Sequence, residues 1–384
     1  MVRIRDSDAM SMKLLIVQPW FSAIGHPAQS LINMASAIGK DERVDYLVSD
    51  NAKAGFCPES MERLRKWGRV ESFAVTTPTG HSNTVRALLR LWRMRLNGSQ
   101  YQRIFFFDES LVVLALLWPL LSSRVTVERL SVLHLFGPIG PRLGVRNSLA
   151  RLVIGRFLKR PEVRLYLRTE ELAQAWCETY EAVAGGQIGH LPSLEIPDDE
   201  PSQYPARSTE ALAFGIIGQV RVGKGIEWLV PAFQNNAALG KLTVAGEFYN
   251  PRYRERLPVL RGFDGFINCY MSEGDMLERA AGQDYLLMLY DVWDKRMESA
   301  VLYLAARVNR PVVVYGDSWC GRMVKEFGCG VVAPVGRQET VELLRQIPRP
   351  GSAEYARLLK GMAEFRQAYC AKSLRGKVIQ ELLS

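Results

Sequence analysis

The sequence predicts an α/β protein made of two Rossmann-like, doubly wound domains that face each other across a cleft. Short apolar runs alternate with helical stretches along both halves of the 384-residue chain, as they do in parallel sheets. Between the halves, residues 191–210 contain four prolines and an acidic cluster, which interrupt the alternation and indicate a linker. The length also favours two domains over one.

In the first half, we expect an N-terminal domain over residues 1–190. The first apolar run is followed by a loop with Gly25 and Pro27, and then by a helical pattern through Leu31, Met34 and Ile38. The expected strands are residues 13–18, 44–49, 103–108, 124–129 and 163–169.

The second half repeats the scheme, which predicts a C-terminal domain over residues 211–365 and a last helix from about residue 364 to 383. In two such sheets, ligands bind at the carboxyl ends of the strands. The expected strands are residues 211–218, 241–247, 265–270, 284–290, 311–316 and 329–334.

Composition excludes several classes of protein. Six cysteines occur without a CxxC pair, so neither a disulfide framework nor a zinc site is indicated, and a reducing cytoplasm is the simplest setting. We expect the first residues to contain a buried strand and not a signal peptide, and the longest apolar run, residues 111–121, is too short to cross a bilayer. No GxGxxG follows the first strand and the four histidines are dispersed, so we expect neither a dinucleotide cofactor nor a metal.

The strongest chemical signal is FGIIGQVRVGKGIEWL, residues 214–229. A strand leads into a glycine-rich turn, and a helix opens near Gly225. Backbone N–H groups at Gly218 and Gly225, together with Arg221 and Lys224, could bind a pyrophosphate there. The alternative is a loop whose two cations are merely solvated, and spacing alone gives the two interpretations equal weight.

A second candidate anion site lies in residues 293–317. Polar residues run to Glu298 and Ser299, and an apolar helix starts at Ala300. Glu298 or Ser299 can therefore cap a helix whose N-terminus faces an anion. The alternative is an amphipathic helix packed on a sheet, which is compatible with either role.

Five blocks in series resemble the donor-binding half of the family 4 glycosyltransferases, which have the two-domain GT-B fold. They are GQVRVGKG, LTVAGE, LLMLYDVW, ESAVLYLAARVNRPVVV and WCGRMVKEFGCGVV, and together they cover about residues 211–335 in the family's order and spacing. The resemblance implies a nucleotide-sugar donor and no cofactor. It also implies that the last helix, residues 366–384, crosses back to the first domain.

The resemblance assigns roles to residues of both anion sites. It implies that Arg221 and Lys224 contact the donor diphosphate, and that the loop at Glu298, Ser299 and Ala300 meets its distal phosphate. The chain departs from the family where Glu298 replaces Asn and Ala300 replaces Gly. A third departure is Leu304, which stands where many members have the Glu that holds the ribose.

The first half offers several catalytic candidates. By resemblance, Gly25 and His26 lie in a loop that faces the donor sugar or the acceptor, and a His contacts the donor sugar in the region of His134. Asp108 and Glu109 end an expected strand and could supply a general base if the reaction inverts the anomeric centre. The alternative for Asp108 is a helix cap.

Charge points to a partner of the N-terminal domain. The net charge is +9, and residues 51–168 hold twenty Lys and Arg against seven Asp and Glu. Residues 85–96 and 145–160 read as amphipathic helices with Trp92 or Phe157 on the apolar side, to which Trp118 would add, as in helices at an anionic membrane interface. The alternative is that these apolar faces belong to the core. No nucleic-acid-binding module accompanies the charge, so a nucleic-acid partner is not expected.

These observations together predict a cytoplasmic glycosyltransferase, peripheral at the inner face of the membrane. It would transfer a sugar to a lipid-linked saccharide in surface polysaccharide synthesis, without a metal, because Arg221, Lys224 and the helix N-terminus neutralise the leaving diphosphate. The family resemblance implies that the reaction retains the anomeric configuration. One alternative is an inverting GT-B transferase or sugar-nucleotide epimerase that uses Asp108 and Glu109. Another is a catalytically silent partner subunit, which the departures at Glu298, Ala300 and Leu304 would suit.

Overall fold

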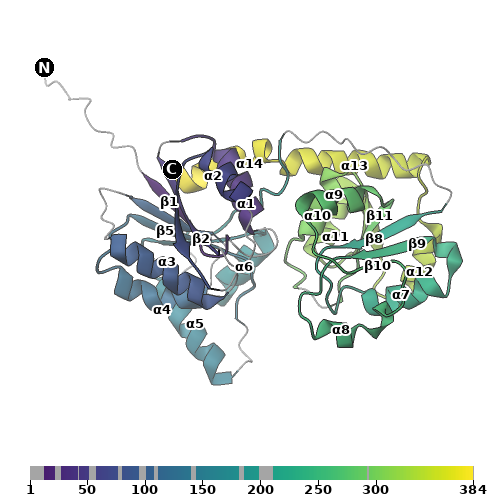
Figure 1. Cartoon of the computed structure of the whole chain (residues 1–384), viewed down its shortest axis with the longest axis horizontal. Helices are drawn as coiled ribbons and strands as arrows, with labels where there is room; N and C mark the ends of the chain where they lie inside the picture. The colour runs from purple at the N-terminus through teal and green to yellow at the C-terminus, as the bar shows by residue number, and fades with distance from the viewer. Residues whose placement is uncertain are drawn as a thin grey trace, which may run out of the picture. The chain divides into compact units, whose positions relative to one another are not determined.

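The computed structural model describes residues 13–21, 27–41, 43–51, 58–76, 80–94, 101–107, 111–139, 144–180, 186–198, 211–291 and 294–383. These residues form two compact units (Figure 1). The first unit comprises the described residues up to Leu194 and those from Leu374 onward, and the second is Glu195–Ser373.

The first unit is built on a parallel sheet with the strand order β3-β2-β1-β4-β5-β6-β7. Central strands are covered on both faces, which is why their sequences are continuously apolar. The strands are β1 (Leu14–Gln18), β2 (Val44–Asp50), β3 (Arg69–Ala74), β4 (Arg103–Phe106), β5 (Arg129–His134), β6 (Val163–Leu167) and β7 (Ile188–His190).

The prediction of a strand over residues 124–129 is wrong, because β5 begins only at Arg129. In β5, Leu130 pairs with Ile104 of β4 and with Val163 of β6. The alternation of polar and apolar residues over 124–129 suits a strand with one solvent-exposed face. The strand position between β4 and β6 is instead buried on both faces of the sheet. The more apolar segment Leu130–Leu133 therefore occupies it.

Helices cover both faces of this sheet (Figure 1). Right-handed crossovers on the two sides of β1 put α1 and α2 on one face and α3, α4 and α5 on the other, where α4 packs between its two neighbours. The helices are α1 (Pro27–Ile38), α2 (Pro58–Arg65), α3 (His81–Met94), α4 (Leu111–Leu121), α5 (Gly144–Leu158) and α6 (Glu170–Thr179).

The second unit repeats the topology with the strand order β10-β9-β8-β11-β12-β13, again parallel. One core lies under α9, α10, α11 and α13, and the other lies under α7 and α12. The strands are β8 (Ala213–Ile217), β9 (Lys241–Ala245), β10 (Phe266–Ile267), β11 (Tyr285–Met288), β12 (Val312–Tyr315) and β13 (Gly330–Ala333). The helices are α7 (Ile226–Gln234), α8 (Tyr253–Arg256), α9 (Glu273–Ala281), α10 (Ala300–Arg307), α11 (Trp319–Phe327), α12 (Arg337–Gln346) and α13 (Ala353–Tyr369).

The last helix is broken, contrary to the expectation of one continuous helix over residues 364–383. α13 ends at Tyr369, and α14 (Ala371–Leu383) begins after Cys370, whose backbone is extended. Cys370 bridges to Ile196, and the Ala371 N–H donates to the Ile196 carbonyl at 3.0 Å. This backbone pairing competes with the helical hydrogen bonds and ends α13. Beyond the break, α14 packs on the first unit, where the Leu382 carbonyl accepts from Arg103 at 3.1 Å.

Among the described residues, no helix combines the length and the apolar character needed to span a bilayer.

Candidate active site

The second unit presents its candidate site at the carboxyl ends of its central strands. Strand order reverses between β8 and β11, and the crevice at such a reversal is where doubly wound sheets bind ligands. β8 runs into residues 218–225, after which α7 opens with Gly225 as its N-cap. β11 runs into Leu289 and Tyr290 on the other side of the reversal.

Glycines allow the backbones around this crevice to approach one another closely. Gly225 has a φ of 77°, and a Cβ there would lie 2.8 Å from the Leu289 carbonyl oxygen. Gly246, after β9, has a φ of 148°, and a Cβ there would lie 2.0 Å from the Gly218 carbonyl oxygen. Side chains at these two positions would push the loops apart.

Hydrogen bonds then fix the 218–225 loop between its neighbours. The Gly223 N–H donates to Glu227 Oε1 at 2.8 Å, and the Gly223 carbonyl accepts from the Asp291 N–H at 2.9 Å. On the other side, Val220 bridges to Phe248 in the loop after β9. The loop is therefore held from both sides and does not rely on a ligand for its shape.

Lys224 is a buried cation without a carboxylate partner. Its side chain belongs to a residue only 6% exposed, and none of the described carboxylates forms an ion pair with it. Burial first, and the nearby Arg221 second, lower the pKa of Lys224 to about 7. Burial likewise lowers the pKa of Arg221. The Arg221 guanidinium therefore lies near a buried lysine that pairs with none of the described carboxylates, and a buried cation of this kind is a candidate for binding an anionic ligand.

Lys224 is enclosed in the structure and is not a solvated loop cation, whereas its role toward phosphate stays a prediction. Solvated lysines keep their side chains in water, whereas this one is enclosed beside the Tyr290 ring, with Nζ 5.9 Å from the ring centroid. Tyr290 in turn lies 3.3 Å, between hydroxyl oxygens, from Ser299.

Ser299 caps α10, as expected from the sequence. Its Oγ accepts from the Val301 N–H at 3.3 Å, so Ala300 is the first helical residue. The helix N-terminus and the two cations are linked through Tyr290, which contacts both Ser299 and Lys224. Both candidate anion sites found in the sequence thus meet around one tyrosine, which the sequence reasoning had not selected although it ends an apolar strand.

The Glu298 carboxylate is engaged by its own helix. Its Oε2 accepts from the Tyr303 hydroxyl at 2.7 Å, and Tyr303 is buried in an aromatic cluster with Phe365 and Trp319. This bond fixes the carboxylate beside the first turn of α10. Leu304, the third departure from the family pattern, is buried in the core under α10.

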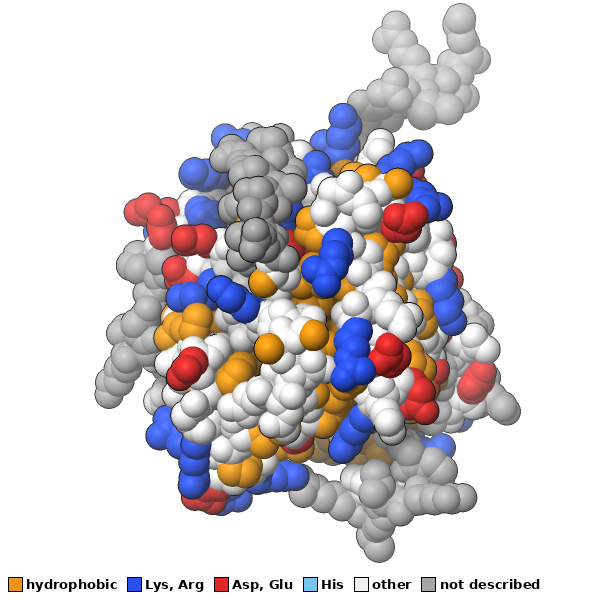
Figure 2. Space-filling view, turned by 90° about the vertical axis from the view of Figure 1, so that its right-hand side faces the viewer, with side chains coloured by type: hydrophobic (Ala, Val, Ile, Leu, Met, Phe, Trp, Pro, Cys, Tyr) orange, Lys and Arg blue, Asp and Glu red, His pale blue; other side chains and the backbone are white. Residues whose placement is uncertain are grey.

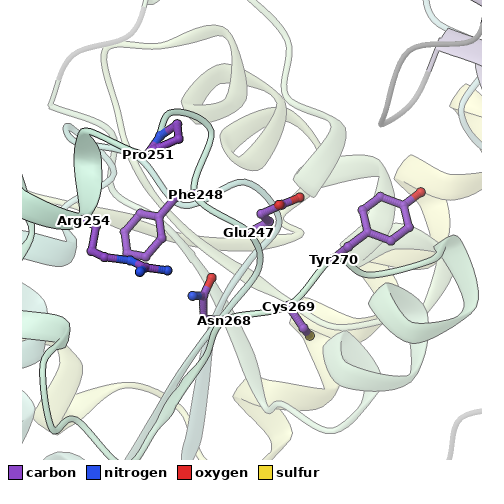
Figure 3. Close-up of a pocket in the computed structure, with 7 residues that line it drawn as sticks. All are labelled: Glu247, Phe248, Pro251, Arg254, Asn268, Cys269 and Tyr270. Atoms are coloured by element: carbon purple, nitrogen blue, oxygen red, sulfur yellow. The ribbon is translucent and has the colours of Figure 1, made fainter. Parts of the chain in front are cut away.

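A pocket of about 430 Å³ adjoins the glycine loop (Figure 3). It lies beyond the ends of β9 and β10, and the Val220–Phe248 bridge connects it to the 218–225 loop. The expected strand over 265–270 ends at Ile267, and its remaining residues supply one wall of the pocket. Sequence reasoning did not single out the lining, which is Glu247, Phe248, Pro251, Arg254, Asn268, Cys269 and Tyr270.

One of the catalytic candidates predicted in the first unit, His134, is among the described residues and lies at the end of a strand. His134 is the last residue of β5, and its ring packs edge-on against Trp176 at 5.5 Å and Phe136 at 5.8 Å between centroids. These contacts make the ring part of an aromatic cluster at the carboxyl edge of the sheet. Gly25, His26, Asp108 and Glu109 lie outside the described residues.

Comparison with known proteins places the fold. No protein-family model matches the chain, and no curated protein matches it. Among solved structures, HepE from Anabaena in complex with UDP-glucose is 12% identical with a TM-score of 0.69, over 96% of this chain and 99% of that one. A glycosyltransferase from Rickettsia africae is 8% identical with a TM-score of 0.70, over 97% and 98%. Sucrose-phosphate synthase from Thermosynechococcus elongatus is 12% identical with a TM-score of 0.67, over 96% and 98%.

These likenesses confirm the predicted fold class. The chain has the GT-B fold, two parallel-sheet α/β domains, along almost its whole length. At 8–12% identity the likeness concerns the fold alone.

Proposed function

We propose that this protein is a glycosyltransferase that takes a sugar from a nucleotide-sugar donor bound by its C-terminal unit. The observation that carries the proposal is the buried, unpaired Lys224 beside Arg221 at the switch point of the second sheet. A diphosphate is the anion that suits two cations and a nearby helix N-terminus, because it carries charge on two adjacent groups.

The same residues would supply the chemistry of transfer. The bond between the anomeric carbon and the diphosphate oxygen breaks, and Arg221 and Lys224 stabilise the negative charge that develops on the leaving nucleoside diphosphate. The acceptor hydroxyl attacks the anomeric carbon from the same face and gives its proton to the leaving phosphate. The expected outcome is retention, with the chain's own cations in the role that a metal has in other transferases.

We propose that the pocket beyond β9 and β10 holds the nucleoside. Tyr270 is exposed and can stack on a base, the Asn268 amide can both donate and accept hydrogen bonds, and the Arg254 guanidinium lies over the Phe248 ring, 5.8 Å from its centroid (Figure 3). The pocket adjoins the 218–225 loop through the Val220–Phe248 bridge, as a nucleoside adjoins its diphosphate. HepE, one of the similar structures, was solved with UDP-glucose.

For the acceptor, we propose a lipid-linked saccharide used in surface polysaccharide synthesis, with the protein cytoplasmic and peripheral at the membrane. Support comes from the basic excess of residues 51–168 and from the family resemblance of the donor half. Catalysis from the first unit would involve His134, which lies at the carboxyl edge of its sheet.

A panel of nucleotide sugars tests the proposal. The protein is incubated with UDP-, GDP-, ADP- and TDP-sugars, and thermal stabilisation and release of nucleoside diphosphate are measured. The expected result is that one donor class both raises the Tm and is slowly hydrolysed, whereas neither effect with any donor would refute the donor site. If a donor binds but is not turned over, even after an acceptor extract is added, the result would favour a catalytically silent partner subunit. The buried Leu304, at the position where the resemblance places a ribose-binding Glu, supports that alternative.

A further inference from the structure

The helix α4 has an unusual outer face. All eleven residues of α4, LVVLALLWPLL, are apolar, and five of them, including Trp118, are buried. The others form the outer side, where Leu116 is 54% and Leu120 is 72% exposed. A helix that is apolar all round is normally enclosed by protein or by lipid. This one has an uncovered side.

The neighbouring helices extend the apolar surface. α3, α4 and α5 lie side by side on one face of the first sheet, so the sides that do not touch the sheet point the same way (Figure 1). On those sides, α3 exposes Leu89 and Trp92, and α5 exposes Leu149 and Leu152. Phe157 and Trp118, which the sequence suggested as membrane anchors, are buried in the core instead.

The charge on this layer has one sign. The sequences of α3, α4 and α5 contain no Asp or Glu, whereas α3 contributes Arg86, Arg90 and Arg93, and α5 contributes Arg151 and Arg156. Of these, Arg90 pairs with Glu71 of β3 at 3.2 Å. Just after α4, the Arg124 guanidinium lies 4.5 Å from the centroid of the Trp92 ring. By contrast, the end of the second unit seen in Figure 2 mixes cations and carboxylates among its apolar side chains.

We propose that the outer face of α3, α4 and α5 docks on an anionic lipid bilayer, with the leucines of α4 inserted among the acyl chains. Exposed leucines flanked by arginines, on three helices that themselves contain no carboxylate, match the two attractions that hold an interfacial helix. A second copy of the chain fits less well, because a two-fold contact through this face would bring the arginines of one protomer against those of the other. The inference deepens the proposed function, since a lipid-linked acceptor lies in such a membrane.

Vesicle binding with matched leucine variants tests the apolar part. The full chain is centrifuged with vesicles of phosphatidylcholine or of phosphatidylcholine with phosphatidylglycerol. We expect binding to the anionic vesicles and at least about tenfold weaker partitioning of Leu116→Ser/Leu120→Ser, because two side chains no longer enter the acyl region. Val335→Ser is the control, since Val335 is equally exposed, at 73%, but lies in the second unit.

Charge variants test the electrostatic part. Arg93→Glu/Arg156→Glu should lose about fivefold in partitioning for each cation removed, and release should increase with salt. Arg261→Glu, an exposed site in the second unit, should bind as the wild type does. Equal binding to neutral and anionic vesicles, equal binding by the leucine variant, or dimer formation through this face in sedimentation velocity would each overturn the proposal.

These experiments distinguish failure of the membrane-docking proposal from failure of the proposed glycosyltransferase function. Hydrolysis of the nucleotide sugar in solution, without vesicles, should be the same in the leucine variant and the wild type, because α4 lies in the other unit from Lys224. Loss of vesicle binding with intact hydrolysis supports both proposals. Intact hydrolysis together with absent vesicle binding by the wild type sinks only the docking surface.

Discussion

The strands β1 and β8 occupy the same place in sheets of the same order, yet they lead into different chemistry. β1 ends at the buried amide Gln18, and the described residues after it, 19–21, are uncharged. β8 leads into Arg221 and the buried Lys224. Both edges are switch points and could take a ligand. The comparison teaches that topology provides the crevice, whereas a few charged residues decide what can bind in it.

The two units also use cations differently. In the first unit, Arg90 and Arg93 of α3 and Arg156 of α5 are exposed to water, where they can attract a surface over a Debye length. In the second, Lys224 is enclosed, so that the charged form carries a burial penalty that an anionic ligand would offset. The predictions below separate these two roles.

The largest effect is expected from removing the enclosed cation. Lys224→Met should lower kcat by about 100-fold or more, since charge on the leaving group is no longer stabilised. It should also raise the Tm of the unbound protein, because a buried charge without a partner is replaced by an apolar chain of similar length. Steady-state kinetics and calorimetry measure both. Lys325→Met, at an exposed lysine of the same unit, should change neither, and full activity of Lys224→Met would contradict the site.

Crowding the glycine loop should have the next largest effect. Both Gly246 and Gly262 have positive φ, so alanine at either costs about 1–3 kcal/mol in backbone strain. Only at Gly246 would the added Cβ also meet the Gly218 carbonyl oxygen, whereas no atom lies within 4 Å at Gly262. We expect Gly246→Ala to weaken donor binding more than tenfold and Gly262→Ala to leave it unchanged. Isothermal titration calorimetry measures the donor affinity of both variants. Equal affinities of the two variants would mean that the 218–225 loop does not bind the donor.

The lowered pKa of Lys224 predicts a pH dependence. Its pKa is about 7 in the folded protein against 10.5 in the unfolded chain. Below about pH 7 the lysine is charged in both states and the burial penalty is complete; from about pH 7 to pH 10 the penalty is relieved, so the unbound protein gains stability. A diphosphate favours the charged form, so affinity should fall by up to about tenfold per unit above about pH 7. Titrations across this range should show the fall in the wild type, whereas Lys224→Met should give a flat profile.

A smaller effect should follow from releasing Glu298. In Tyr303→Phe the carboxylate loses its hydrogen bond to the Tyr303 hydroxyl and is held less firmly beside the first turn of α10, so its charge should raise the KM for the donor several-fold. Adding Glu298→Gln removes the repulsion and should restore most of the affinity. Tyr355→Phe also loses a buried hydrogen bond, at 2.9 Å to the Asp284 carbonyl, and should lower the Tm without changing KM. If the second substitution brings no rescue, Glu298 does not act through its charge.

The smallest effect is expected at Asp108. Under retention the leaving phosphate takes the acceptor's proton, so Asp108→Asn should keep most of the activity. Transfer rates and the anomeric configuration of the product by NMR give the readout. A folded but inactive Asp108→Asn protein, with a wild-type product of inverted configuration, would instead establish Asp108 as the general base of an inverting enzyme.

The sequence determined most of the fold because the sheet is held by local and periodic patterns. Apolar runs such as residues 284–290 and 311–316 can be satisfied only as strands buried on both faces, and Ser299 before an apolar helix is a local capping signal. For the same reason the strand, glycine-rich turn and helix around Arg221 and Lys224 could be predicted in advance. Its strand, turn and helix lie within about a dozen residues of one another.

Only the tertiary structure decided which side chains are enclosed and what they meet. Sequence spacing left the surroundings of Lys224 open, and the structure encloses it beside Tyr290, 66 residues away, so that phosphate binding there stays a prediction. The same applies to Trp118 and Phe157, which pack inward, and to Cys370, where pairing with Ile196 interrupts a helical pattern. Burial and long-range pairing depend on residues far apart in the chain. A local sequence pattern can therefore indicate a role for a side chain, but it does not determine which residues surround that side chain.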